Sequence, residues 1–195
     1  MPTPDPIRRT IEALVGPIRY EGPALSRHFR ARTLERGEPW LRHGEVCRTL
    51  GFVRRGTLRL YVESETGEQT RWAFFDGQFF TSLQSFQQRI PSAESIAAIE
   101  PCDVLEIDRE AFWRLHAEHP FLQHYWQLNM ERLTSCYEDR VNSLLLPSAV
   151  ERYRYTLQRY PDFVLRLPRK YVAEMLNMAP RHLSRVRREV AGRDD

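Results

Sequence analysis

A short basic segment between Arg166 and Val190 holds the residues whose types and spacing could bind a polyanion. It contains seven basic residues and two acidic ones, a balance of +5, whereas the whole chain of 195 residues carries +3. Concentrated positive charge in a nearly neutral chain favours a polyanionic partner. Charge alone leaves open the alternative of a solvated helix face. The basic residues are Arg166, Arg169, Lys170, Arg181, Arg185, Arg187 and Arg188.

Residues 169–190 have helix-turn-helix spacing, with two short helices joined by a tight turn. Asn177 falls at the turn, where φ must be positive and asparagine is the best choice after glycine. Pro180 falls in the first turn of the second helix, where a missing N–H does no harm. Ala173 lies where the helices cross closely. The expected core between them is Val172, Leu176, Leu183 and Val186. A second helix presented in this way fits the major groove of DNA, although a plain helical hairpin is the alternative.

The second helix carries the residues that we expect to read the bases. Arg181 and Arg185 are four residues apart and share one helix face, and Arg181 lies in the first turn, nearest the bases. An arginine there can donate two hydrogen bonds to guanine. Ser184 is small enough to let the backbone approach and can donate to a phosphate. The full expected set is Arg169, Lys170, Arg181, His182, Ser184, Arg185 and Arg188, of which Arg169, Lys170 and Arg188 are placed for phosphates.

The elements that must position this segment begin with a short helix and a β region. Residues 6–15 have apolar residues at helical spacing, with Asp5 placed to cap the helix and Pro6 in its first turn. From about residue 20 to residue 109 the chain has short stretches of β-branched and aromatic residues separated by turns, which predict strands within 41–46, 51–63, 70–80 and 104–109. Two of these, 57–63 and 70–74, flank a Thr66-Gly67 turn and predict a hairpin. With no helix expected between the strands, this region predicts a sandwich or small barrel.

A long helix follows, because no proline or glycine interrupts the chain between Pro120 and Pro147. One apolar stripe runs along it, too broad for its own strand domain to cover, so a second copy of the helix is the expected partner. A single helix lying across a monomer is the alternative. Ser148 then caps another helix, which Pro161 ends, and residues 163–170 look like a short connection. The expected dimer interface is Leu122, Trp126, Met130, Leu133, Tyr137, Val141 and Leu144.

Several classes of protein are disfavoured. No secretory signal and no apolar stretch of membrane-spanning length is present, so we expect a cytoplasmic protein with no membrane partner. Three cysteines without CxxC spacing suit neither a disulfide framework nor a zinc or iron–sulfur site, and are expected to be small buried residues. No nucleophile elbow, phosphate-binding loop or dinucleotide motif is present, so we expect no enzyme and no metal. The alternative is a metal- or haem-dependent jelly-roll protein, a cupin-like enzyme or a gas sensor, using the histidines around Pro120: His116, His119 and His124.

Along nearly its whole length the chain resembles the Crp/Fnr transcription regulators. Residues 43–62, HGEVCRTLGFVRRGTLRLYV, look like the glycine-punctuated early strands of that family's cyclic-nucleotide-binding domain. Residues 101–112, PCDVLEIDREAF, look like its last strand and the next helix, and the long helix looks like its dimerisation helix. The family pattern places a base-reading arginine at Arg185. With five residues after Val190, the chain is most similar to a shortened branch without a C-terminal wing.

The resemblance implies an α+β fold: an antiparallel β jelly-roll sensor at residues 1–118, a dimerisation helix at 119–147 and an all-α helix-turn-helix domain at 148–195. It also implies a homodimer that binds double-stranded DNA with two-fold-related half-sites and works with RNA polymerase. The effector, the operator and the direction of regulation stay open at this point.

The chain departs from the family pattern in the effector pocket. The family's Gly-Glu pair for the ribose is replaced by Thr81-Ser82, and the Arg-Ser pair for the phosphate by Ser92-Ala93. A buried phosphate without a cation is costly, so we expect no cyclic AMP and no other cofactor that the sequence identifies. Aromatic residues, Phe79 among them, suggest an apolar interior. The expected pocket residues are Phe79, Thr81, Ser82, Ser92 and Ala93.

Overall fold

The structure, a computed structural model, describes residues 5–65 and 67–192. By its internal contacts the chain divides into two compact units. The first unit holds the described residues up to Val62 together with Ala73–Arg132, and the second holds Glu63–Trp72 and the chain from Leu133 onward. One helix, α4 (Pro120–Leu145), and one hairpin, formed by β4 (Leu58–Ser64) and β5 (Gly67–Phe74), therefore contribute to both units.

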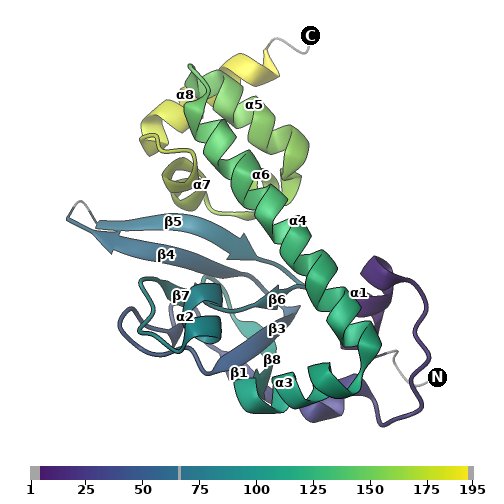
Figure 1. Ribbon diagram of the computed structural model, residues 1–195. Helices are drawn as coiled ribbons and strands as arrows, with labels where there is room; N and C mark the ends of the chain where they lie inside the picture. Colours follow the sequence, from purple (N-terminus) through teal and green to yellow (C-terminus); the bar gives the residue numbers. More distant parts are fainter. Residues whose placement is uncertain (1–4, 66, 193–195) are drawn as a thin grey trace. The chain divides into compact units, whose positions relative to one another are not determined.

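Two antiparallel four-stranded sheets form the β part of the chain (Figure 1), which confirms the predicted α+β fold with a jelly-roll-like domain. One sheet has the order β1-β8-β3-β6 and the other β2-β7-β4-β5. The remaining strands are β1 (Arg30–Leu34), β2 (Pro39–Leu41), β3 (Thr49–Arg55), β6 (Phe79–Phe80), β7 (Ser95–Ala98) and β8 (Cys102–Asp108). Gly51 of β3 faces the Phe80 ring of β6, and a Cβ at this glycine would lie 2.2 Å from that ring, so no side chain fits there.

Helix α1 (Pro6–Val15) begins as the sequence predicts. The Asp5 side chain accepts a hydrogen bond from the backbone N–H of Ile7, and Pro6 occupies the first turn. A 3₁₀ turn at Leu25–His28 follows. The buried residues of α1 pack in one apolar cluster with residues of β3, β8 and the first turns of α4, which fixes α1 to the first unit. The cluster consists of Ile7, Ile11, Ile18, Leu25, Phe52, Leu105, Leu122 and Tyr125.

Three details of the sequence prediction were wrong. A short helix, α2 (Leu83–Gln88), lies between the strands, where none was expected. The stretch 41–46, expected as a strand, pairs at Leu41 and then only through an isolated bridge at Val46. Residues 163–170, expected as a connection, begin inside helix α6 (Pro161–Arg166). That helix forms because Pro161 fits a first turn. It ends at Arg166, since Leu167 precedes Pro168 and is extended, as residues before proline tend to be.

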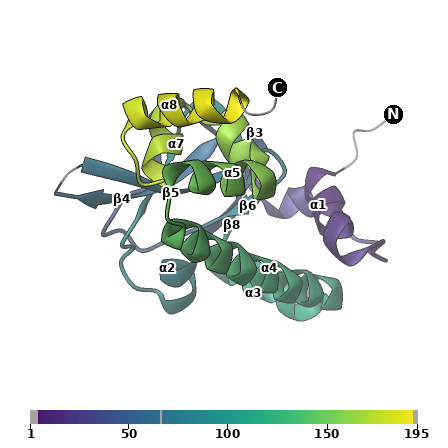
Figure 2. The ribbon, with the colours of Figure 1, turned by 90° about the horizontal axis from the view of Figure 1, so that it is seen from above.

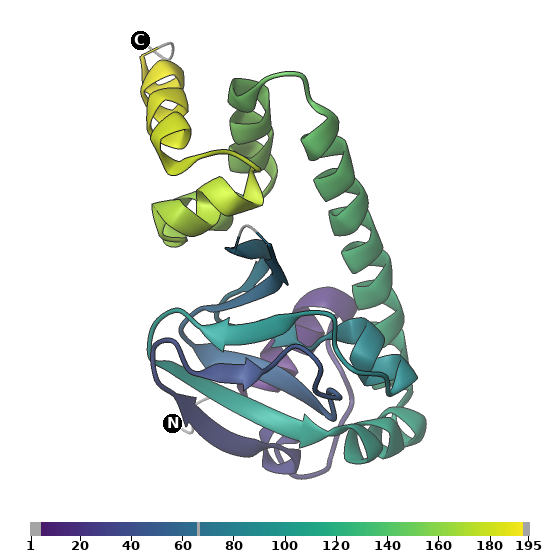
Figure 3. The same cartoon turned by 90° about the vertical axis from the view of Figure 1, so that its left-hand side faces the viewer.

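The helical elements of the second unit follow α4. Helix α5 (Ala149–Arg159) starts at a capping box, in which Ser148 and Glu151 satisfy each other's backbone N–H groups, as the Ser148 cap predicts. Helices α7 (Arg169–Met175) and α8 (Pro180–Ala191) complete the unit (Figure 3). Helix α8 packs against both α5 and α7 (Figure 2). No helix of the described chain is long and apolar enough to cross a membrane.

Candidate functional site

Helices α7 and α8 form the helix-turn-helix that the spacing predicts. Asn177 has φ +50° in the turn, a conformation that costs asparagine less than most residues. Ala173 is fully buried, and Pro180 opens α8. The side chains expected to form the small core are all buried: Val172, Leu176, Leu183 and Val186.

The outer face of α8 is basic and open to solvent. Arg181, His182, Arg185 and Arg188 are exposed. The half-buried Ser184 hydroxyl donates to the Pro180 carbonyl, four residues earlier in the same helix, at 3.1 Å. The face can therefore offer three guanidinium groups and one imidazole to a polyanion.

Arg169 and Lys170 open helix α7 and are also exposed. The Lys170 ammonium lies 3.9 Å from the Glu174 carboxylate, one turn along the same helix. The pair is weak, because its two charges are far apart for an ion pair and the Lys170 side chain is 66% exposed to solvent. Lys170 can therefore turn toward a phosphate at small cost.

Glu174 links α7 to strand β5, a contact that the sequence analysis missed. Its carboxylate accepts hydrogen bonds from the backbone N–H of Thr70 at 3.1 Å and from the Thr70 hydroxyl. Its carbonyl oxygen accepts from the Gln69 amide. Thr70 is completely buried, so the first helix of the helix-turn-helix is fixed to a segment about 100 residues away in sequence. An acid inside a basic segment was the one signal available in the sequence.

Of the residues expected to form an effector pocket, Ser82 and Ser92 are brought together. Ser82 and Ser92 are buried with their hydroxyl oxygens 2.9 Å apart. The Ser92 hydroxyl donates to the Glu94 carbonyl at 2.7 Å, and the Ser82 hydroxyl can give its single hydrogen either to Ser92 or to the Glu94 carboxylate at 3.0 Å. The Thr81 hydroxyl donates to the Thr49 carbonyl. A carboxylate therefore stands beside the two serines where the family pattern has a cation.

The other expected pocket residues lie apart from this network. Phe79 packs against the rings of Phe29, Phe52 and Tyr125, and Ala93 is exposed. Arg89, at the end of α2, is exposed, and its guanidinium lies 3.9 Å from the Glu110 carboxylate. The one arginine near the expected phosphate position in the sequence thus has an acidic partner of its own.

The apolar stripe of α4 divides into two parts. Leu122 belongs to the core of the first unit and is already covered within one chain, and Trp126 packs against Phe112 and Trp113. Met130 and Leu133 are half-buried. Further along, Tyr137, Val141 and Leu144 are exposed, with Val141 58% accessible. Leu145, which the sequence analysis did not include, is 76% accessible on the same end of the helix.

Two of the three histidines around Pro120 pack against aromatic rings, and the third, His124, is exposed. His116 lies against Phe112 and Trp113, and burial lowers the pKa of its imidazole. His119 stacks on Phe121. Among residues 5–65 and 67–192, no group of three or more His, Cys, Asp or Glu side chains is placed to hold a metal ion. Of the cysteines, Cys47 and Cys102 are buried and Cys136 is half-buried.

Comparison with known proteins identifies the β part of the chain. Residues 31–119 match the cyclic nucleotide-binding domain family. No curated protein sequence matches the chain.

Solved structures share the fold across most of the chain. A CooA mutant from Carboxydothermus hydrogenoformans has a TM-score of 0.73 at 18% identity, covering 93% of this chain and 83% of that one. The c-di-GMP responsive global regulator CLP from Xanthomonas campestris has a TM-score of 0.68 at 16% identity, covering 87% and 89%. A transcriptional regulator assigned to the Crp/Fnr family from Eubacterium rectale has a TM-score of 0.65 at 19% identity, covering 87% and 81%. The chain therefore carries a cyclic nucleotide-binding domain at residues 31–119 and has the fold of a Crp/Fnr-type regulator.

Proposed function

We propose that this protein is a sequence-specific DNA-binding transcription regulator that works as a homodimer and catalyses no reaction. The observation that carries the proposal is the exposed basic face of α8, presented on a buried helix-turn-helix core with a left-handed turn at Asn177. Solved proteins with this fold include a global regulator and a Crp/Fnr-family transcriptional regulator. RNA polymerase is the partner that such a regulator would recruit or block.

Two groups of residues have separate roles on DNA. Arg181 and Arg185 share the exposed face of α8 and can each donate two hydrogen bonds to a guanine in the major groove. Arg169, Lys170 and Arg188 bind phosphates, which fixes the register of the helix without reading sequence. His182 adds a donor or acceptor beside the bases. The Ser184 hydroxyl is bonded to its own helix, so its role is to leave room for the sugar-phosphate backbone.

The dimer forms through the second half of α4. Each chain has an exposed apolar strip on this half of the helix, formed by Tyr137, Val141 and Leu144. Such a strip is typical of helices that pair with a partner helix, which removes the apolar side chains from water. Two chains related by a two-fold axis present two α8 helices to successive turns of the major groove. The DNA site is therefore a pair of two-fold-related half-sites.

The effector, where one is used, is not cyclic AMP. The site of the ribose and phosphate holds Ser82 and Ser92 bonded to each other and to Glu94, and a carboxylate there repels a phosphate. A solved protein of this fold responds to c-di-GMP, so the fold accepts effectors other than cyclic AMP. Titration calorimetry with millimolar cyclic AMP should give no saturable heat, and micromolar binding would refute this part of the proposal.

Selection of genomic DNA fragments by the purified protein tests the function. We expect enrichment of a short sequence with two-fold symmetry. The double variant Arg181→Ala/Arg185→Ala should lose preference for that sequence, while Arg54→Ala, which removes an exposed charge from the first unit, should keep it. If no sequence is enriched, or if the double variant selects the same sequence as the natural protein, the proposed function is wrong.

A further inference from the structure

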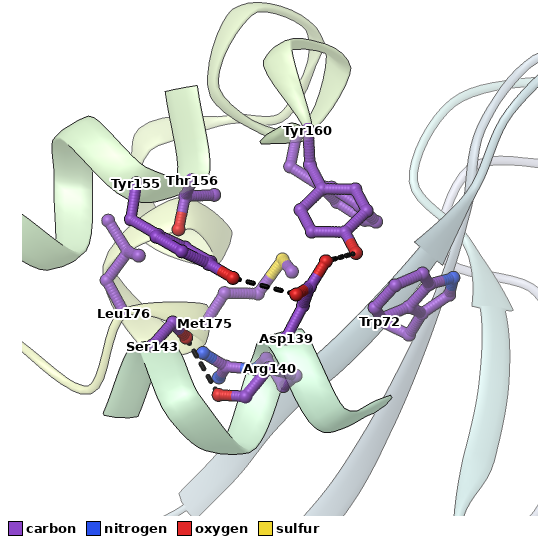
Figure 4. A pocket seen from close by; sticks show the side chains of 10 residues that line it. Trp72, Asp139, Arg140, Ser143, Tyr155, Thr156, Tyr160, Met175 and Leu176 are labelled. Atoms are coloured by element: carbon purple, nitrogen blue, oxygen red, sulfur yellow. Dashed lines mark hydrogen bonds between the residues drawn. The ribbon is translucent and has the colours of Figure 1, made fainter. Parts of the chain in front are cut away.

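A small cavity lies in the second unit between α4, α5, α6, α7 and Trp72 of β5 (Figure 4). Its free volume is about 20 Å³, enough for one water molecule or one ion of similar size. Much of its wall is apolar, formed by Trp72, Phe163, Met175 and Leu176. Apolar walls lower the local dielectric constant, so a charge inside the cavity interacts more strongly with the charged groups around it than it would in water.

The one acid that lines the cavity is fully engaged. Asp139 accepts hydrogen bonds from the Tyr155 hydroxyl at 2.8 Å and from the Tyr160 hydroxyl at 2.7 Å. The Arg159 guanidinium binds the same carboxylate through two nitrogens, at 3.1 and 2.9 Å. These bonds lower the pKa of the Asp139 carboxyl, with the Tyr160 hydroxyl the largest cause. The negative charge of Asp139 is therefore used by Arg159 and the two tyrosines.

Arg140, the next residue, has no such partner. Its half-buried guanidinium makes no hydrogen bond and no ion pair with any residue in the described part of the chain. Burial, with a smaller contribution from the charge of Arg71, lowers the pKa of Arg140 to about 10. The Ser143 hydroxyl beside it donates to the Arg140 carbonyl and leaves the guanidinium unpaired. A partly desolvated cation without a counter-charge is costly, and it stays charged at neutral pH.

A second polar group opens into the same cavity. The Thr156 side chain is buried, and its hydroxyl has no hydrogen-bond partner among the described residues. In Figure 4 this hydroxyl and the Arg140 side chain both lie among the residues that line the cavity. Both can donate a hydrogen bond, whereas a guanidinium cannot accept one. A ligand that accepts from both and carries a negative charge would satisfy the site.

We propose that this cavity binds a single small monovalent anion of chloride size, held by the Arg140 guanidinium and the Thr156 hydroxyl. The free volume excludes a nucleotide and other large anions, and the unpaired cation excludes a metal ion. Met175, the last residue of α7, and Leu176, which follows it, form one wall. A bound anion therefore stabilises the packing of the helix-turn-helix against α4, and this ion site lies outside the face that we assign to DNA.

Chloride-35 NMR of the full chain tests the site without DNA. At constant ionic strength, with gluconate replacing chloride, we expect protein-dependent broadening of the chloride line that saturates with chloride. Bromide should reverse it, and gluconate, which is too large to enter, should not. The thermal unfolding midpoint of the second unit should rise with chloride over the same range. Arg140→Gln should weaken chloride binding by about tenfold or more, as expected for the loss of a charge-assisted hydrogen bond.

Matched variants separate a site from a general effect of charge. Thr156→Val keeps the shape of the side chain and should weaken chloride binding to a smaller extent. Arg154→Gln removes a charge from the neighbouring helix α5 without touching the cavity and should leave the broadening unchanged. If the Arg140→Gln variant broadens the chloride line with the same saturation as the natural protein, the proposal is wrong. It is also wrong if gluconate competes with chloride as well as bromide does. Since no arm of this test uses DNA, its failure would leave the proposed function standing.

Discussion

In the first unit the Glu106 carboxylate is only 2% exposed and fully paired, whereas in the second unit the half-buried Arg140 has no partner in the described chain. Glu106 binds Arg30, Arg32 and the indole N–H of Trp40, the last at 2.6 Å. The same difference holds for hydroxyl groups. Those of Ser82 and Ser92 bond to each other, whereas that of Thr156 opens into a cavity.

The difference indicates that the two units have different tasks. The first unit satisfies the buried Glu106 carboxylate and the Ser82 and Ser92 hydroxyls internally, which favours one stable arrangement. The second unit keeps a cation, a hydroxyl, a basic helix face and an apolar strip available to something outside the chain. Unpaired polar groups and exposed apolar strips usually belong to binding surfaces, because they do not stabilise the fold of a single chain. The predictions below test this division.

Breaking the dimer should have the largest effect. Val141→Glu places a charge in the exposed apolar strip of α4, where it does not disturb the fold of one chain but opposes helix pairing. We expect monomers, and a loss of about 10²–10⁴-fold in affinity for a two-fold DNA site because the two half-sites are no longer bound together. Asn142→Glu, at the neighbouring exposed position, is the control. Analytical ultracentrifugation and DNA binding measure both, and a dimeric Val141→Glu protein would show that the partner surface lies elsewhere.

Removing the buried carboxylate of the first unit should have the next largest effect. Glu106→Ala leaves the Trp40 indole N–H and two arginines without their acceptor, so we expect the free energy of unfolding to fall by about 1.5–3 kcal/mol. Hydrogen exchange measured by mass spectrometry should show faster exchange in the strands of the first unit and little change in α7 and α8. Equal acceleration in both units would mean that they do not fold as separate parts. Glu63→Ala, an exposed glutamate of the hairpin, controls for loss of charge.

The basic face should divide into reading and anchoring residues. Lys170→Ala should weaken binding to all DNA sequences about equally and lower the salt slope by about one unit, because one phosphate contact is lost. Arg185→Ala should instead cost about 1–3 kcal/mol on the selected sequence alone. Titrations with selected and scrambled DNA at several salt concentrations separate the two effects. If both variants lose the same factor on both DNAs, this division of roles is wrong.

The sequence was sufficient where the determinants are local. The Asp5 and Ser148 caps, the positive φ at Asn177 and Pro180 at the start of α8 all depend on residues within one turn of each other, and all were predicted. The alternation of apolar residues also predicted the hairpin, although Thr66 of its expected turn lies outside the described residues.

Contacts between distant residues could not be predicted. Nothing in the spacing of Thr70 and Glu174, 104 residues apart, indicates that they share a hydrogen bond. The apolar stripe of α4 likewise does not reveal that Leu122 faces α1 while Val141 faces solvent, because periodicity identifies a face and not the element that covers it. Arg140 was missed for the same reason, since its lack of an acidic partner depends on where Asp139 points.

The smallest expected effect concerns Asp139, the acid that completes the contrast with Arg140. Hydrogen bonds from Tyr160 and Tyr155, together with Arg159, lower the pKa of its carboxyl in the folded chain. A lowered pKa means that this contribution to stability is fully present above the unfolded value of about 3.9 and is lost as the pH falls through the folded value. The second unit should therefore lose stability on acidification below about pH 4.

Asp139→Asn should be less stable than the natural protein at neutral pH and should lack this part of the acid-induced loss. Asp162→Asn, at an exposed position of α6, should keep it. Urea unfolding followed by Trp72 fluorescence between pH 7 and pH 3 would measure all three proteins, with Trp40, Trp113 and Trp126 replaced by Phe so that the signal reports on the second unit. If Asp139→Asn follows the same pH dependence as the natural protein, Asp139 does not hold α4 to α5 through its charge, and the contrast drawn with Arg140 is wrong.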